Sequence, residues 1–218
     1  MNTAPDKKQK DGAWAESVSG RIMNVLDPSP DLISITDIAE GLAKQCRYNG
    51  QIPVFYSVAQ HCTVVADLLP RRLAIYGLLH DAHEAYLGDL ITPVKMAVSA
   101  RVGWNVWKKI EEPLDKAIFE AFGLSWPLSE TDQDILAHAD RVALATEVRD
   151  LKPQSYRNNR KYWQSLPDPA DFMIRPAPWP KAASLYIKKF IRLAEEFCPG
   201  HILTRQGLDA TDIEGSHL

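Results

Sequence analysis

Apolar residues recur at intervals of three or four along most of this chain, the spacing that is typical of amphipathic helices. Residues 58–69 carry such a stripe, and Ser57 precedes it with Gln60 three positions later, the arrangement of a helix-capping box. Asp37 and Glu40 repeat that arrangement at the start of an earlier stripe. The pattern predicts helices over residues 36–49, 57–69, 71–87, 104–122, 130–150 and 181–197, with a shorter one opening at 92–93.

Signals for β-structure are sparse. Residues 21–25 could form a short extended piece, but the sequence shows no convincing strand pair and no internal repeat. Residues 1–20 are polar and expected to be loose, and residues 201–218 form a weakly patterned tail. Between them we expect a single domain over 21–200, within which 153–180 hold six prolines and predict an ordered but irregular excursion. The chain is therefore predicted to be all-α, a compact helical bundle.

Charge and cysteine usage exclude several classes of protein. The 218 residues include 25 basic and 28 acidic side chains, and the net charge of −3 provides no broad field for a nucleic acid polymer or an anionic membrane. The three cysteines are far apart and form no CxxC pair, which argues against a structural zinc knuckle or a disulfide framework. Cys62 falls on a helical stripe and is expected in the core. Residues 1–10 are polar, with no signal-like apolar run, so we expect a cytoplasmic protein.

Polar residues inside otherwise apolar stripes provide the strongest chemical signal. His80-Asp81 follows directly on the apolar run of residues 73–79, and burying such groups costs several kcal/mol, roughly, unless they are paired or bound to a metal. His61 and Asp140 are lodged in the same way in two other predicted helices. Glu84 lies about one helical turn beyond His80, close enough to act on anything that is bound there.

Each of these residues has a plain structural interpretation when taken alone. An inward histidine is more often a hydrogen-bonded core residue, and an inward aspartate is more often a cap or an ion-pair partner. Together, however, two imidazoles and two carboxylates suit one divalent transition-metal ion such as Mn²⁺, Co²⁺, Zn²⁺ or Fe²⁺, with Mg²⁺ also possible. A six-coordinate ion would keep open positions for water and a substrate oxygen, which indicates hydrolytic chemistry.

The order His61, His80-Asp81, Asp140 resembles the HD-domain superfamily of metal-dependent phosphohydrolases. Residues 80–95, HDAHEAYLGDLITPVK, are similar to the signature of its bacterial 5′-deoxynucleotidase branch and of phage-type relatives. The resemblance runs from about residue 35 to 151, and it implies an HD-domain-like fold. It also implies that His61, His80, Asp81 and Asp140 are the metal ligands. Glu84 is then the acid/base, and Asp89 stands near the phosphate and sugar.

The same resemblance implies substrate-binding roles for Arg47, Tyr48 and Lys95. Arg47 occupies the place of a phosphate-binding arginine, and Tyr48 that of an aromatic residue against the sugar 2′ position. An equally weighted interpretation makes Arg47 a helix C-terminal residue that complements the dipole, and Lys95 is more often a surface residue. His83 is expected to be outside the ligand set or to face solvent, and His138 to point away from Asp140.

These residues favour a phosphohydrolase that acts on (deoxy)nucleoside 5′-phosphates, either mono- or triphosphates, as small-molecule substrates. One alternative is a hydrolase of cyclic nucleotides or alarmones, although Ala85 stands where alarmone-hydrolysing relatives carry a second acid. Another is a non-catalytic nucleotide-binding helical domain. The apolar residues 104–122 could also serve as a homodimer interface.

Overall fold

The computed structural model describes residues 12–154 and 165–197, and it is mostly helical, as expected. Its helices are α1 (Ile35–Lys44), α2 (Val58–Leu68), α3 (Ala74–Leu79), α4 (Glu84–Leu87), α5 (Thr92–Val102), α6 (Val106–Ala121), α7 (Glu130–Leu151) and α10 (Trp179–Phe197). Short 3₁₀ turns cover Pro30–Leu32, Arg47–Gly50 and Arg71–Leu73. A small hairpin pairs β1 (Trp14–Glu16) with β2 (Ile22–Asn24). Within the described ranges, no helix combines the length and apolarity needed to cross a bilayer.

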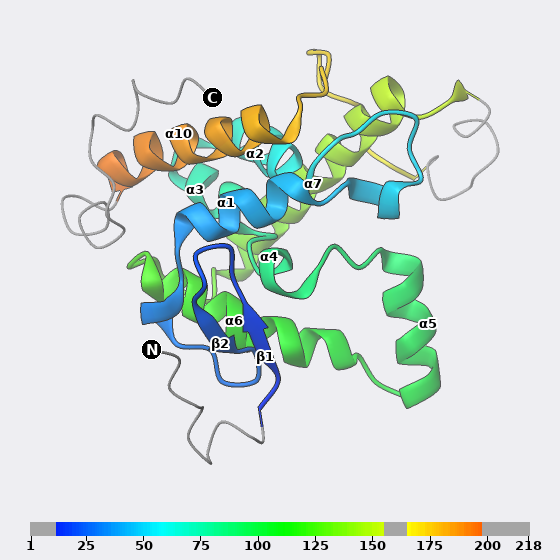
Figure 1. Cartoon of the computed structure of the whole chain (residues 1–218). Helices are drawn as coiled ribbons and strands as arrows, with labels where there is room; N and C mark the ends of the chain where they lie inside the picture. Colours follow the sequence, from blue (N-terminus) through cyan, green and yellow to red (C-terminus); the bar gives the residue numbers. More distant parts are fainter. Residues whose placement is uncertain (1–11, 155–164, 198–218) are drawn as a thin grey trace.

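The core lies where α1, α2, α3 and α10 meet, and Figure 1 shows α10 lying along the same side of the molecule as α1 and α2. Removing a large apolar side chain from water stabilises the fold by about 1.5–3 kcal/mol, so this cluster is the main source of stability. Cys62 belongs to it, as predicted. The cluster also holds the fully buried side chains of Ile38, Leu42, Leu78, Phe119, Phe122, Tyr186 and Phe190.

The helices α2 and α3 pack unusually closely because a glycine lies between them. A Cβ atom built on Gly77 would overlap the Leu69 side chain and lie 3.2 Å from the Cα atom of Ala66. Helix α7 packs against α2 and also contacts α3. This arrangement brings the end of α3 and the middle of α7 toward the same face of α2.

The predicted cap at Ser57 is confirmed, and a second serine caps α7. Ser57 accepts a hydrogen bond from the backbone N–H of Gln60 at the start of α2, and Ser129 accepts one from Asp132 at the start of α7. The reciprocal half of the α2 capping box is absent, because the Gln60 side chain instead binds the backbone of Arg175 and Ala177. Those two bonds hold part of the irregular segment 165–178 against α2.

The first predicted helix begins close to its expected start, but its cap and its end were predicted wrongly. Helix α1 begins at Ile35 after Ser34, and Asp37 does not cap it; its carboxylate instead accepts hydrogen bonds from Ser17 and Ser19. The helix ends at Lys44 rather than near Gly50, and the chain continues into a turn in which Tyr48 and Asn49 have φ values of 60° and 55°. A left-handed backbone of this kind cannot continue a helix.

The prediction of loose residues 1–20 without strand pairing is also wrong for the described part. Residues 14–16 pair with 22–24, and the Asp37 contacts hold the connecting turn. Strands of three residues are too short to show an alternating pattern in the sequence. The hydrogen bonds from the connecting turn to Asp37 stabilise the hairpin instead. Residues 1–11, 155–164 and 198–218 lie outside the description, and with them part of the 153–180 excursion and the predicted tail.

The predicted helix over 71–87 is interrupted at residues 80–83, which include the predicted ligands His80 and Asp81. A 3₁₀ turn opens it, α3 ends at Leu79, and α4 begins only at Glu84. Between them Ala82 and Glu84 donate to the carbonyls of Leu79 and Asp81 at 3.0 Å, bonds of the tighter i→i+3 kind.

Helix α5 starts at Thr92 with Pro93 second, one residue from the expected register, and projects at the edge of the molecule beside α6 (Figure 1).

Candidate metal centre

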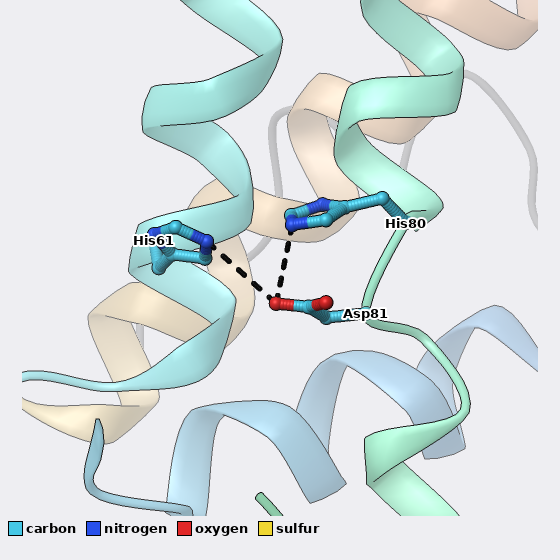
Figure 2. Close-up of side chains that lie close together, drawn as sticks. All are labelled: His61, His80 and Asp81. Atoms are coloured by element: carbon cyan, nitrogen blue, oxygen red, sulfur yellow. Dashed lines mark ion pairs between the residues drawn. The ribbon is translucent and has the colours of Figure 1, made fainter. Parts of the chain in front are cut away.

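His61, His80 and Asp81 converge at the break between α3 and α4. Each offers one ligand atom, and these atoms lie within 4.8 Å of one another. The Asp81 Oδ2 atom is 3.2 Å from His80 Nε2 and 3.6 Å from His61 Nε2. Figure 2 shows both rings directed at the Asp81 carboxylate, His61 from α2 and His80 from the residue after α3.

Asp140 on α7 completes the predicted constellation. Its Oδ1 atom lies 3.1 Å from His61 Nε2 and 3.9 Å from His80 Nε2. Its side chain is 42% exposed, whereas that of His61 is fully buried. The structure thus brings together all four residues that the sequence predicted as ligands, and the cluster is open to solvent on the Asp140 side.

Hydrogen bonds behind the two imidazoles orient them toward this centre. The Nδ1 atom of His61 lies 2.6 Å from Glu147 Oε1, and that of His80 lies 2.8 Å from the Gly77 carbonyl oxygen. Both acceptors require the ring hydrogen on Nδ1. Among the described residues, neither Nε2 atom has a hydrogen-bond partner of acceptable geometry, although both are buried.

Buried imidazole nitrogens that form no hydrogen bond are costly, and a cation between them and the nearby carboxylates would satisfy both nitrogens. Metal-bound histidines generally donate their second ring N–H to a carboxylate or a backbone carbonyl, as both do here. Two nitrogens and two carboxylates also form a donor set suited to a borderline divalent ion. The residues present therefore fit the predicted metal.

The electrostatics of the cluster favour positive charge. Burial acts to lower the pKa of His80, but the Asp81 carboxylate together with Cys62 outweighs it and holds this pKa well above its usual value. Burial and Arg47 likewise act to lower the pKa of His61, and Glu147 with Asp140 leaves it raised. The pKa of Asp81 is pulled far below its usual range by His80, against the effect of burial. An ion that binds here must displace the protons held by the imidazoles.

Glu84 is the buried acid beside the cluster. It is 7% exposed, and its Oε2 atom has no hydrogen-bond partner within the described ranges. Burial, followed by the negative charges of Asp81 and Asp89, raises the pKa of Glu84 to about 9. The carboxyl group therefore keeps its proton at neutral pH in the metal-free protein.

Asp89 lies on the loop after Gly88, and its backbone N–H donates to the Gln45 side chain at 2.7 Å. The same side chain donates to the Glu84 carbonyl oxygen at 2.8 Å. Burial raises the pKa of Asp89, with Arg47 opposing and Asp81 reinforcing the shift. Gln45 thus holds the segment of Glu84 and Asp89 against the chain that carries Arg47.

The helix-dipole interpretation of Arg47 is wrong, because α1 ends before it and Arg47 lies in the following 3₁₀ turn. Its guanidinium is directed inward, with Nε 3.1 Å from Glu147 Oε2 and Nη1 3.9 Å from Asp81 Oδ2. The Tyr48 hydroxyl donates a short hydrogen bond to the same Glu147 oxygen. Arg47 therefore borders the cluster, and Tyr48 lies beside Arg47 on Glu147; their substrate-binding roles stay predictions.

Lys95 is not part of the cluster. Its Nζ atom pairs with Glu111 of α6 at 2.6 Å, and its side chain is 29% exposed. Burial acts to lower the pKa of Lys95, but Glu111 raises it, with smaller contributions from Glu84 and Asp81. Lys95 is therefore within electrostatic reach of the centre without contacting it.

His83 does not face solvent, because it is only 8% exposed and its Nδ1 atom lies 2.8 Å from Asp115 on α6. Its other ring nitrogen, Nε2, lies 3.7 Å from Glu111 Oε1, so both nitrogens face acidic residues of α6. His138 is exposed and lines a hollow of about 430 Å³ between the end of α2 and α7, on the far side from Asp140. Neither residue is a ligand in this arrangement.

Sequence reasoning missed Glu147, which is fully buried and contacts His61, Arg47 and Tyr48. A signal was present: Glu147 follows Asp140 by seven positions, about two helical turns, and so shares its face of α7. Its neighbours Thr146 and Val148 are also buried. An acidic residue in such a setting must be paired, and here three donors pair with it.

No family model matches the chain. It is 34% identical over 186 residues to the uncharacterized protein YfdR of Escherichia coli K12, an alignment that covers 84% of this chain and 97% of YfdR. It is also 35% identical over 185 residues to an uncharacterized protein of Rhodobacter capsulatus, covering 78% of this chain and 91% of that relative. Identity at this level across 84% of this chain and 97% of YfdR shows that the protein belongs to the YfdR family.

Proposed function

We propose that this protein is a metal-dependent phosphohydrolase of the HD-domain superfamily that acts on (deoxy)nucleoside 5′-phosphates. One observation carries the proposal. Two buried imidazoles with their Nδ1 positions already bonded present unpartnered Nε2 atoms to Asp81, and a buried carboxyl group with a raised pKa lies beside them. Carboxylate oxygens lie 3.1–3.6 Å from these nitrogens without a hydrogen bond of acceptable geometry, and a cation between them would satisfy both sets of atoms.

His61, His80, Asp81 and Asp140 would hold the ion. A bound Mn²⁺, Co²⁺, Zn²⁺ or Fe²⁺ supplies Lewis acidity and lowers the pKa of coordinated water. The ligand carboxylates carry two negative charges, which balance one divalent cation. An incoming phosphate therefore needs further positive charge from the protein.

Arg47 supplies that charge next to the centre. A guanidinium presents a planar fork of N–H donors that matches phosphate oxygens, and Arg47 Nη1 already lies 3.9 Å from Asp81. Arg47 binds the phosphate and orients it toward the ligand cluster. Lys95 adds a longer-range positive charge, and Tyr48 lies against the sugar with its ring fixed by the hydrogen bond to Glu147.

Glu84 acts as the general acid. With a pKa of about 9 in the metal-free protein, its carboxyl group carries a hydrogen that it can donate to the leaving ester oxygen. Asp89, held through Gln45, lies on the same side and keeps that pKa high. The preference for nucleotides rests on the resemblance of residues 80–95 to the deoxynucleotidase signature.

The test combines metal analysis of purified protein with a panel of nucleoside mono- and triphosphates, each assayed with Mn²⁺ or Co²⁺ and after chelation. We expect stoichiometric metal and release of inorganic phosphate or triphosphate from at least one nucleotide. Release of a nucleoside monophosphate from a cyclic substrate without inorganic phosphate would favour the cyclic-nucleotide alternative. Nucleotide binding without any turnover would favour a non-catalytic domain and contradict the proposal.

A further inference from the structure

Glu147 divides its two carboxylate oxygens between the two halves of the candidate site. Oε1 lies 2.6 Å from His61 Nδ1, on the side of the predicted metal. Oε2 accepts from Arg47 Nε at 3.1 Å and from the Tyr48 hydroxyl, on the side of the predicted phosphate. The carboxylate and the His61 ring are both completely buried, so water does not compete for these contacts.

Helix α7 also anchors the chain segment that carries Arg47. Lys152 follows Glu147 by five positions, donates to the Gln51 carbonyl oxygen at 2.7 Å, and places its Nζ atom 3.7 Å from the centre of the Tyr48 ring. Asp140, on the same helix, lies 3.1 Å from His61. Helix α7 thus contacts one predicted metal ligand and supplies another, and the residue that follows it holds the turn of the predicted phosphate-binding side chain.

From this geometry we propose that Glu147 is a positioning residue that couples cation binding at His61 to phosphate binding at Arg47. The proposal rests on the function proposed above. The negative charge of Glu147 holds the imidazole hydrogen on Nδ1 and leaves Nε2 for the cation. Through its other oxygen, the same charge fixes the guanidinium and the Tyr48 ring of a turn whose backbone is left-handed at Tyr48.

Glutamine cannot replace Glu147 in both roles. A carboxylate accepts hydrogen bonds on both oxygens, whereas a carboxamide has one accepting oxygen and an NH₂ group that only donates. In Glu147→Gln, the NH₂ group must face either the His61 N–H or the donors of Arg47 and Tyr48. One half of the site therefore loses its orientation, while the volume and shape of the side chain stay nearly unchanged.

The experiment compares wild-type protein with Glu147→Gln and with a control, Glu196→Gln. The control removes a half-exposed carboxylate of α10 that pairs with Arg71. The affinity for Co²⁺ is measured by titration calorimetry and from the absorption spectrum of the bound ion, without nucleotide. Affinity for inorganic phosphate is measured on the cobalt-loaded proteins. Loss of a group that orients a metal-bound histidine typically lowers metal affinity about 10- to 100-fold.

We expect Glu147→Gln to lower Co²⁺ affinity in that range, to shift the Co²⁺ spectrum and to weaken phosphate binding, while Glu196→Gln leaves all three unchanged. Arg47→Ala should weaken phosphate binding alone. The double variant Arg47→Ala/Glu147→Gln should bind phosphate more tightly than the product of the two single losses predicts, because both changes remove the same contact. Wild-type Co²⁺ affinity and spectrum in Glu147→Gln would overturn the inference.

Tyr48→Phe provides a second variant if Glu147→Gln does not fold. It removes one donor to Oε2 and retains the ring, so we expect weaker phosphate binding with an unchanged Co²⁺ spectrum; unchanged phosphate binding would contradict the coupling. These binding measurements do not depend on turnover. If the wild-type protein binds Co²⁺ and phosphate but hydrolyses no nucleotide, the proposed function is wrong, while the variants still test the coupling through Glu147. A wild-type protein that binds no divalent ion would overturn both proposals.

Discussion

The Nδ1 atom of His80 lies 2.8 Å from the carbonyl oxygen of Gly77, one turn earlier on α3. This contact fixes the tautomer of a predicted metal ligand through the backbone rather than through another side chain. Gly77 is also the point at which α3 approaches Ala66 of α2. The position of His80 therefore depends on the closeness of two helices as well as on its own sequence neighbours.

Gly77→Ala should destabilise the protein, because a Cβ atom there would displace a Leu69 methyl group and lie 3.2 Å from the Ala66 Cα atom, which is backbone and cannot rotate away. Overpacking of this kind costs about 1–3 kcal/mol, although alanine is the better helix former. We expect a lower midpoint of urea unfolding and weaker metal binding through displacement of His80. Gly41→Ala should lower the stability by less than Gly77→Ala, because the added Cβ atom would lie 3.1 Å from the Cβ atom of Ala85. A gain in stability for Gly77→Ala would show that the helices are not in contact at this position.

Asp81→Ala and Glu84→Gln should separate metal binding from turnover. Asp81 lies within 3.6 Å of both imidazole Nε2 atoms, so its removal should abolish stoichiometric metal, measured by elemental analysis after gel filtration. Glu84→Gln keeps the shape of a protonated carboxyl group but cannot give up a proton as an acid. It should retain the metal and lower kcat by about 10²- to 10⁴-fold. Full activity in both variants would show that these roles are wrongly assigned.

Arg47→Ala should reduce kcat/KM by about 10²- to 10³-fold, as expected for a cation that stabilises charge on a reacting phosphate. Arg47→Lys should restore little of this loss, since an ammonium group cannot replace the planar fork that contacts both Glu147 and the phosphate. Arg72→Ala is the matched control, because Arg72 is 57% exposed and pairs with Asp132 away from the cluster. Steady-state kinetics on the best nucleotide decide the comparison, and equal losses at Arg47 and Arg72 would count against a phosphate-binding role.

The chelated protein should lose stability as the pH rises from about 5 to about 9. The pKa values of His61 and His80 are raised in the fold, so their contribution is complete below the unfolded value of about 6.5 and is lost as pH rises through the folded values. The pKa of Glu84 is raised to about 9, so the cost of its burial also grows over this range. Each shift means that the folded protein binds more protons than the unfolded chain, so all three act in the same direction.

Urea unfolding in the presence of a chelator, at about pH 5.5, 7 and 8.5, measures this effect. Added Mn²⁺ should restore stability, and by more at the higher pH, because the ion no longer competes with protons on the imidazoles. Chelated protein that becomes more stable between pH 6 and pH 9, roughly, would contradict the direction of these shifts.

Local rules of sequence determined a large part of this protein. The helical class, the starts of α2 and α7 at Ser57 and Ser129, and the core position of Cys62 follow from periodicity and capping, which act over a few residues. The four predicted ligands were also visible in the sequence, since polar groups in apolar stripes must find partners inside the fold.

Only the tertiary structure decided how those groups are oriented. The burial that raises the pKa of Glu84 and the contacts of Glu147 with His61 and Arg47 depend on packing between segments far apart in the chain. The contact of His80 with Gly77 spans only three positions, but the break of the helix that follows it was not predicted from the sequence. Glu147 lies 86 positions from His61 and 100 from Arg47. A pattern over a few neighbouring residues cannot predict contacts at such separations. Burial brings such groups together and removes the water that would otherwise satisfy them, so their chemistry is a property of the packed molecule.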